Sequence, residues 1–256
     1  MFKNILVWGI LRGMEYKYQG IILNKRDIGE ADRIYTIYTL EAGKIRILGK
    51  GVRKPNAKLA GNLESVTQAE IFIAKNKGMG KVTGSIPANN FSNIKTDLDL
   101  LNKVFYAFRV LSRLISEEEK DEKIFKLLEE YLSSMDELGD RKDKADILTS
   151  GFLFKILDEM GYRLEVEKCV HCGKRLLMEN NYFSVARGGT LCGACRGVEN
   201  KKMPFSNDSI KLVRIFLRNK IRNFTKLDVP AQDADKLRII VRETLDWLNS
   251  SILRFD

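Results

Sequence analysis

The sequence predicts a multidomain α+β protein with a small five-stranded β-barrel, a helical domain, and a cysteine-rich module inserted into the helical domain. Three observations support this order. Short strand patterns separated by turn residues fill residues 18–87. From residue 91, apolar residues recur at spacings of three and four, the period of an α-helix. Between residues 165 and 202 that period is lost, and cysteine, glycine, lysine and arginine become frequent. The predicted domains are residues 14–90, 91–164, 165–202 and 203–256.

Five runs in the first third of the chain have the composition of short β-strands. Residues 33–40 are rich in β-branched and aromatic residues, and Ile45 and Ile47 alternate with the polar Arg46. Five short strands within about 70 residues fit a small closed barrel, and the OB-fold is the five-stranded barrel that most often binds oligonucleotides. The predicted strands are residues 18–23, 33–40, 44–52, 66–75 and 81–86.

The next region predicts amphipathic helices, each with one apolar face. Gly161 stands where a helix C-terminal cap is expected, and Ser206 stands where an N-terminal cap is expected. A final helix carries apolar residues from Leu237 to Ile252. The first predicted helix has its apolar face at Ile94, Leu98, Leu101, Phe105, Phe108, Leu111 and Ile115. The second and third are centred on residues 124–135 and 147–160.

Residues 1–13 precede the first strand pattern and form an extension, so that either Met1 or Met14 is the natural start. Their apolar stretch is followed by Arg12 and Gly13 instead of the small-residue pattern of a signal-peptide cleavage site. No segment of the chain approaches the roughly 18 continuous apolar residues of a membrane helix. We therefore expect a cytoplasmic protein with no membrane segment.

The charge is distributed unevenly along the chain. The protein has a net charge of +10, yet residues 1–90 carry +8 and residues 91–168 carry −5. Clustered cations bind polyanions, because each phosphate contact releases condensed counterions. The basic first block therefore predicts a surface for a polyanion. The alternative is that these cations only keep a small domain soluble.

All four cysteines fall into two C-x-x-C pairs, Cys169/Cys172 and Cys192/Cys195. This spacing lets two thiolates of one tight turn point at a common centre, so two such turns complete a tetrahedral site for one Zn²⁺. Four thiolates leave no position for water, which predicts a structural ion. Two disulfides, a redox-active dithiol and an iron–sulfur cluster are the alternatives. The only histidine, His171, lies inside the first turn, and we expect it to face solvent.

The chain lacks the residue patterns of the common enzyme classes. A single histidine removes most acid–base catalysis that depends on that residue. Gly80-Lys81 is followed by Val82 and has no upstream glycine at the spacing of a nucleotide-binding P-loop. No spacing of carboxylates indicates a two-metal nuclease. We therefore expect a protein that is not an enzyme and has no small-molecule substrate.

A second signal is the basic segment, residues 50–58, which follows a predicted strand and contains Lys50, Arg53, Lys54 and Lys58. Glycines flank its start, so we expect a flexible loop whose cations follow a phosphate backbone without reading bases. Aromatic residues of the barrel offer stacking surfaces if they face outward. For Tyr35, Tyr38 and Phe72 the alternation of strand residues favours the core instead.

The string from Tyr18 to Pro55, with its G-E-A-D-R turn and G-K-G-x-R-K loop, closely resembles the opening of RecO proteins. The order of the following parts resembles them too, and the likeness extends from Met14 to Asp256. This resemblance implies an N-terminal OB-fold, a helical domain and an inserted four-cysteine zinc finger. It also implies a bacterial, nucleoid-associated recombination mediator in DNA repair, which is not an enzyme.

The resemblance implies partners as well. RecO proteins bind single- and double-stranded DNA, anneal complementary strands, contact the C-terminal tail of single-stranded DNA-binding protein, and act with RecR to load RecA. The alternative is an RNA-binding or transcription accessory protein that uses the same barrel and zinc ribbon. We expect DNA to contact Arg26, Arg33, Lys44, Lys50, Arg53, Lys54 and Lys58. We expect the acidic partner tail to contact Arg109, Arg113 and Lys155.

Overall fold

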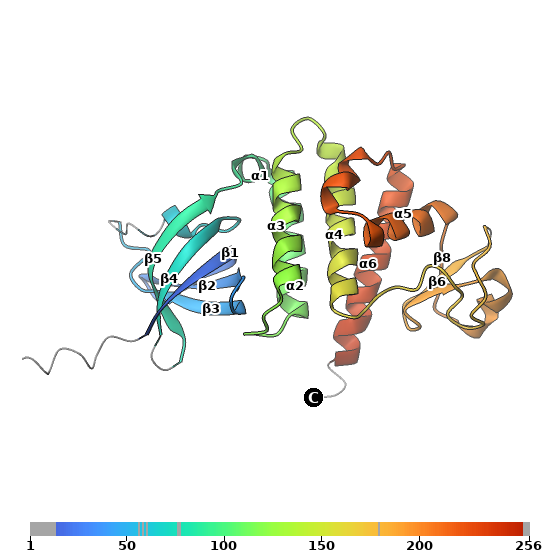
Figure 1. Cartoon of the computed structure of the whole chain (residues 1–256), viewed down its shortest axis with the longest axis horizontal. Coiled ribbons are helices and arrows are strands. Elements are labelled where there is room, and N and C mark those ends of the chain that lie inside the picture. Colours follow the sequence, from blue (N-terminus) through green and yellow to red (C-terminus); the bar gives the residue numbers. More distant parts are fainter. Residues whose placement is uncertain are drawn as a thin grey trace, which may run out of the picture. The chain divides into compact units, whose positions relative to one another are not determined.

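The structure of the chain is a computed structural model, which describes residues 14–55, 57, 59, 61–75, 78–178 and 180–252 (Figure 1). The predicted extension, residues 1–13, lies outside the described residues. The chain divides into two compact units. One contains the strands of the N-terminal region together with Leu111–Phe125, and the other contains Thr96–Val110 and the chain from Lys126 onward. The domain boundaries given above stay predictions.

The first unit is built on a closed barrel of five strands in the order β1-β2-β3-β5-β4. The pair β3 and β5 is parallel, and the other pairs are antiparallel. This confirms the predicted five-stranded OB-fold. The strands are β1 (Met14–Ile28), β2 (Asp32–Thr39), β3 (Gly43–Gly49), β4 (Gln68–Lys75) and β5 (Gly80–Asn89), with a short 3-10 helix, η1 (Gly61–Leu63), before β4.

The barrel interior follows the alternation of the strands. In β3, Ile45 and Ile47 are buried whereas Arg46 is exposed, as the sequence predicts. Gly20 of β1 is required by close packing, since a Cβ atom there would lie 2.6 Å from Cγ2 of Ile37. The core of the barrel consists of Ile22, Tyr35, Ile37, Ile45, Ile47, Val52, Leu63, Ala69, Ile71, Ile73 and Val82.

The second unit is helical. Its central helix, α4 (Ala145–Glu159), is buried on nearly every side and contacts α5 (Asn207–Arg218), α6 (Ala231–Ile252) and the 3-10 helix η4 (Ile221–Lys226). Figure 1 shows α4 beside α5 and α6. The other helices of the chain, of which most of α1 and parts of α2 and α3 belong to the first unit, are α1 (Ser92–Thr96), α2 (Leu98–Leu114), α3 (Glu122–Asp136), and the 3-10 helices η2 (Lys142–Lys144) and η3 (Gly193–Val198).

Local capping signals in the sequence are confirmed. At the end of α4, Gly161 has φ +83°, its N–H donates to the carbonyl of Asp158, and the N–H of Tyr162 donates to that of Leu157. This is the Schellman arrangement that glycine favours. At the start of α5, the hydroxyl of Ser206 accepts from the N–H of Ser209 at 3.1 Å.

The first predicted helix was wrong in two respects. The chain breaks at Asp97 into α1 and α2, because the Asp97 carboxylate accepts from the N–H groups of Asp99 and Leu100 and starts a new helix. The buried face is also different: Leu98 is 73% exposed and Phe105 is 38% exposed. The residues that α2 buries are Leu100, Val104, Ala107, Phe108, Val110 and Leu111.

The cysteine module lies between α4 and α5 in the sequence, as predicted. It contains a small sheet in the order β7-β6-β8, made of β6 (Tyr182–Ser184), β7 (Gly189–Leu191) and β8 (Met203–Pro204). In the part of the chain that the structure describes, no helix is both long and apolar enough to span a bilayer.

Candidate metal centre and nucleic-acid interface

The four cysteines of the two C-x-x-C turns converge on one point. Their Sγ atoms all lie within 4.8 Å of one another, and none forms a disulfide. Four sulfurs bound tetrahedrally at about 2.3 Å from one ion lie roughly 3.8 Å apart. The Sγ atoms of Cys172 and Cys192 are 3.9 Å apart. The cluster therefore fits a metal ion, as the spacing of Cys169, Cys172, Cys192 and Cys195 predicted.

Each C-x-x-C turn, here called a knuckle, is shaped by its own backbone. In the first knuckle, the N–H of Gly173 donates to the carbonyl of Cys169, and Gly173 adopts φ +71°. In the second knuckle, the N–H of Cys195 donates to the carbonyl of Cys192. The N–H of Cys192 also points at Sγ of Cys169, at 3.4 Å. His171 is exposed in the first knuckle and is not part of the cluster, as predicted.

The surroundings of the sulfurs favour a thiolate at one position. Burial raises the pKa of the Cys169 thiol. The backbone N–H groups of Cys172, Cys192 and His171 lower it by a larger amount, so that the pKa is about 6. Burial and the neighbouring sulfurs raise the pKa of Cys195 to about 12. Crowded thiols behave in this way because each negative charge opposes the next one. A cation at the centre removes that opposition.

Helix α5 attaches the cysteine module to the rest of its unit. Nε of Arg214 donates to the carbonyl of Val166 at 3.0 Å, and the Glu167 carboxylate pairs with both Arg214 and Arg218. The rings of Phe183 and Phe205 meet edge to face at 5.5 Å. The cysteine module is therefore joined to α5 by these hydrogen bonds and ion pairs.

On the barrel, a shared carboxylate organises the basic segment. Asp27 at the end of β1 accepts from Nε of Arg33 at 2.7 Å and lies 3.3 Å from Nε of Arg53. Arg53 also donates to the carbonyl of Gly29 at 3.0 Å. The hydrogen bond from Arg33, with both guanidinium charges, holds the pKa of Asp27 below its usual value.

The described part of the basic segment is hydrogen-bonded to the turn between β1 and β2, which the prediction of a flexible loop did not anticipate. Besides the Arg53 contacts, the N–H of Gly51 donates to the Asp32 carboxylate at 2.6 Å, and the N–H of Arg53 donates to the carbonyl of Ala31. The segment is therefore fixed to the turn between β1 and β2. This connection joins distant parts of the sequence, so the local pattern did not reveal it.

The other predicted DNA-binding residues fall into two groups. Arg26, Lys50 and Lys54 are exposed. Lys44 is turned inward, because its ammonium group donates to the carbonyls of Ser112 and Ile115 at the end of α2, and burial lowers its pKa. A cation at that place stabilises the C-terminus of α2. Lys58 lies outside the described residues. The role of all seven predicted residues in DNA binding stays a prediction.

The structure reveals an aromatic pair that the sequence analysis missed. Tyr35 and Tyr38 are both fully buried, although alternation places them on opposite faces of β2: Tyr35 lies in the barrel core, and the ring of Tyr38 stacks on that of Phe125 at 6.4 Å. Phe72 is half-buried. The rings of Tyr16 and Tyr18 instead stack at 5.9 Å on one face of β1, where they line a cavity of about 650 Å³. The two residues are spaced i, i+2 and hence share a face, which was the signal in the sequence that could have found them.

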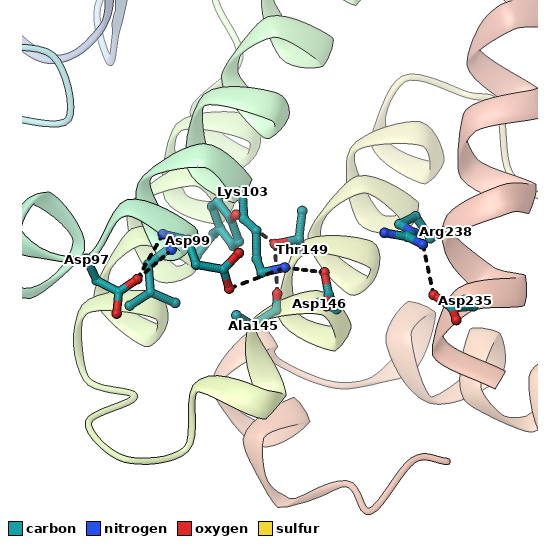
Figure 2. Close-up of polar contacts among 10 residues, drawn as sticks. Asp97, Asp99, Lys103, Ala145, Asp146, Thr149, Asp235 and Arg238 are labelled. Carbon is teal, nitrogen blue, oxygen red and sulfur yellow. Dashed lines mark hydrogen bonds and ion pairs between the residues drawn. The ribbon is translucent and has the colours of Figure 1, made fainter. Parts of the chain in front are cut away.

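A second cavity, of about 500 Å³, lies among α2, α4 and α6. Its lining includes the apolar residues Tyr106, Leu153, Ile239 and Val241. On its polar side, the ammonium group of Lys103 lies 2.7 Å from the Asp146 carboxylate. Arg238 also lines the cavity and pairs with Asp235 at 2.9 Å (Figure 2). Arg242 completes the cationic part of the lining.

Of the three predicted partner-binding residues, the structure connects one with this cavity. The guanidinium of Arg109 lies 5.9 Å from the ring centre of Tyr106, which lines it. Arg113 and Lys155 are not among the lining residues. The cations that do line this cavity are Lys103, Arg238 and Arg242. The sequence did not predict them, because they come together only when three helices pack.

Comparison with known proteins identifies the family. The family model "Recombination protein O N terminal" matches residues 14–91, and "Recombination protein O C terminal" matches residues 95–250. A DNA repair protein RecO of Dehalococcoides mccartyi is 33% identical over 234 residues, which cover 91% of this chain and 90% of the relative. One from Roseiflexus sp. strain RS-1 is 32% identical over 80% of this chain and 70% of the relative, and one from Bacillus pumilus is 28% identical over 94% and 92%. The chain belongs to the RecO family of DNA repair proteins.

Proposed function

We propose that this chain is a non-enzymatic recombination mediator that binds single- and double-stranded DNA and anneals complementary strands. In this proposal it also acts with RecR to load RecA onto DNA coated by single-stranded DNA-binding protein. Its family membership supports the role in DNA repair. The alternative, an RNA-binding or transcription accessory protein, is not favoured, because the matched relatives are DNA repair proteins.

The observation that carries the proposal is the cationic surface around Asp27. One carboxylate holds the guanidinium groups of Arg33 and Arg53, and Lys50 and Lys54 stand exposed on the same fixed segment. Two arginines that share one carboxylate retain a net positive charge. The two arginines held by Asp27 contact phosphates with little loss of side-chain entropy, and none of the four cations is arranged to read bases. DNA binding through this surface is therefore expected to be independent of sequence.

We further propose that the metal is a single structural Zn²⁺ held by Cys169, Cys172, Cys192 and Cys195. Sulfur donors select soft or borderline ions, and closed four-cysteine sites in small knuckles are typical of zinc. When bound, the ion would supply folding free energy to the module and no reaction chemistry. Residues 169–195 would thereby become a rigid platform.

The tail of single-stranded DNA-binding protein, an acidic peptide with a terminal phenyl ring, is proposed to bind the cavity among α2, α4 and α6. The apolar lining formed by Leu153, Ile239 and Val241 suits the ring. The guanidinium groups of Arg238 and Arg242 on α6 suit the carboxylates of the tail. Their present partners, Asp235 and Glu243, are neighbours on the same helix, and such exposed pairs are weak and readily exchanged.

A strand-annealing assay tests the central activity. The full-length chain is mixed with two complementary DNA oligonucleotides, one of them labelled, and duplex formation is followed with and without single-stranded DNA-binding protein. We expect the chain to accelerate annealing of DNA. A rate equal to that without protein would remove the proposal, and acceleration of RNA annealing alone would favour the RNA-binding alternative.

A further inference from the structure

The hairpin that carries the first knuckle places two cations directly opposite each other. Lys168 and Arg175 are partners in an antiparallel bridge, and the N–H of Leu176 continues the pairing by donating to the carbonyl of Glu167 at 3.2 Å. Directly opposed residues in an antiparallel pair project from the same face. Like charges at such positions destabilise the pair. The arrangement is therefore unfavourable unless an anion lies against it.

No acidic side chain in the described part of the chain supplies that anion. Lys168, Lys174 and Arg175 are exposed, and no ion pair involves them among the described residues. The two acids that precede Lys168 in the sequence are engaged elsewhere. Glu165 accepts from two backbone N–H groups, and Glu167 pairs with two arginines of α5.

The second knuckle adds to this positive charge. Arg196 follows Cys195 directly and is exposed. The convergence of the four Sγ atoms within 4.8 Å brings the two knuckles together. Four thiolates around a divalent ion keep a net negative charge, but it offsets only part of the charge of these cations. The module surface thus stays positive with the metal in place.

Two apolar side chains continue directly from the cationic hairpin. Leu177 is 76% exposed and Met178 is 71% exposed, the largest exposures among the big apolar residues of the module. Neighbouring cations and exposed apolar side chains match a nucleic-acid strand, which presents phosphates on one side and the faces of bases on the other. To match this surface, an acidic protein partner would have to carry an apolar patch directly beside its carboxylates.

We propose that the cysteine module is a second surface for single-stranded DNA. In this arrangement, Lys168, Lys174, Arg175 and Arg196 contact phosphates, and Leu177 and Met178 contact bases. The inference rests on the proposed function, since it assigns a second DNA site to the same chain. One site on the barrel and one on the module would let a single chain hold two strands during annealing.

The charge of the module is tested with the double variant Lys168→Gln/Arg175→Gln in the full-length, metal-loaded chain. The affinity for a labelled single-stranded oligonucleotide is measured between about 50 and 200 mM salt, where phosphate contacts dominate the dependence. Each lost contact lowers the slope of log affinity against log salt by about 0.7 for single strands. We expect a decrease of about 1.4 for the two contacts.

The matched control is Lys220→Gln/Lys226→Gln, which removes the same charge from two exposed positions, one just before η4 and one at its last residue. We expect it to keep the wild-type slope. Unchanged affinity and slope in the module variant overturn the inference while leaving the barrel site intact. Wild-type protein that does not bind DNA at all instead overturns the proposed function. If the first variant loses metal, the double variant Lys174→Gln/Arg175→Gln replaces it, because neither residue is adjacent to a cysteine and both belong to the proposed surface. The same decrease in slope is expected of it.

The proposed contact of Leu177 and Met178 with bases is tested by a second double variant. Leu177→Ala/Met178→Ala removes apolar contacts and no charge, so we expect a several-fold weaker affinity with an unchanged salt slope. Both side chains are largely exposed, so the metal content and the melting temperature should stay the same. An unchanged affinity would show that bases do not reach the module.

Discussion

Removal of one sulfur ligand should loosen the whole cysteine module and leave the rest of the helical unit folded. The perturbation is Cys172→Ser, which takes one of four Sγ atoms from a cluster that lies within 4.8 Å. Within residues 169–202 the large apolar side chains that are fully buried are Phe183 and Leu191. Full burial of such a side chain contributes about 1.5–3 kcal/mol, so this pair contributes roughly 3–6 kcal/mol.

The metal outweighs that contribution. Structural Zn²⁺ binds zinc-finger peptides with about 10–16 kcal/mol at neutral pH, and this free energy is coupled to folding. The strands of the module have only two or three residues each, so backbone pairing adds little. We therefore expect loss of the metal to unfold residues 165–202 locally. Helices α4 and α5 should persist, because they pack against each other and against α6.

Elemental analysis and hydrogen exchange measure this effect together. Wild-type protein under reducing conditions should contain about one zinc per chain. In Cys172→Ser, amides of the module should exchange much faster, whereas those of α4 should not change. His171→Ala is the matched control, since it alters the same knuckle but removes no ligand. Less than half an equivalent of zinc in the wild type, or full protection of the module after complete metal removal, would contradict a structural role of the metal.

Three further predictions concern the partner cavity, the Asp27 cluster and the helical core. Arg238→Ala/Arg242→Ala should weaken binding of an acidic peptide that ends in phenylalanine, measured by fluorescence anisotropy, whereas Lys211→Ala should not; equal binding by both variants would exclude the cavity among α2, α4 and α6. The pKa of Asp27 is lower in the folded state than its ordinary value of 3.8, so the ionised carboxylate stabilises the fold at pH values above 3.8. This stabilisation is lost as the pH falls through the lowered pKa. Asp27→Asn should therefore reduce the melting temperature at pH 7 and have a smaller effect at pH 3, and a pH-independent difference would contradict the assignment. Gly151→Ala should cost about 1–3 kcal/mol in a denaturant titration, because a Cβ atom there would lie 2.5 Å from the ring of Phe224, and unchanged stability would show that the ring moves aside.

Features that depend on a few consecutive residues were predictable from the sequence. The alternation of Ile45, Arg46 and Ile47 predicted which side of β3 enters the barrel. Gly161 and Ser206 predicted helix ends because capping is decided within about four residues. The C-x-x-C spacing predicted each knuckle for the same reason, since each is formed by its own backbone hydrogen bonds, and the shared metal then requires the two knuckles to meet.

Features that depend on distant residues were not predictable. Nothing near Arg53 in the sequence shows that Asp27 would fix it, because that contact requires the barrel to close first. Lys44 looked like a surface cation, yet it stabilises the end of α2. Leu98 fits the apolar period of a helix, but the break at Asp97 changes which face is buried.

The barrel surface is tested most directly by the salt dependence of DNA binding in a variant that lacks two of its cations. Lys50→Gln/Lys54→Gln removes two exposed cations from the basic segment and leaves Asp27, Arg33 and Arg53 in place. If these lysines contact phosphates, affinity for unrelated single-stranded oligonucleotides should fall alike, and the slope against log salt should decrease by about 1.4. The melting temperature should stay the same, because exposed substitutions usually change stability by under about 0.5 kcal/mol. Wild-type affinity and slope in this variant would contradict the assignment of the barrel as a DNA-binding surface.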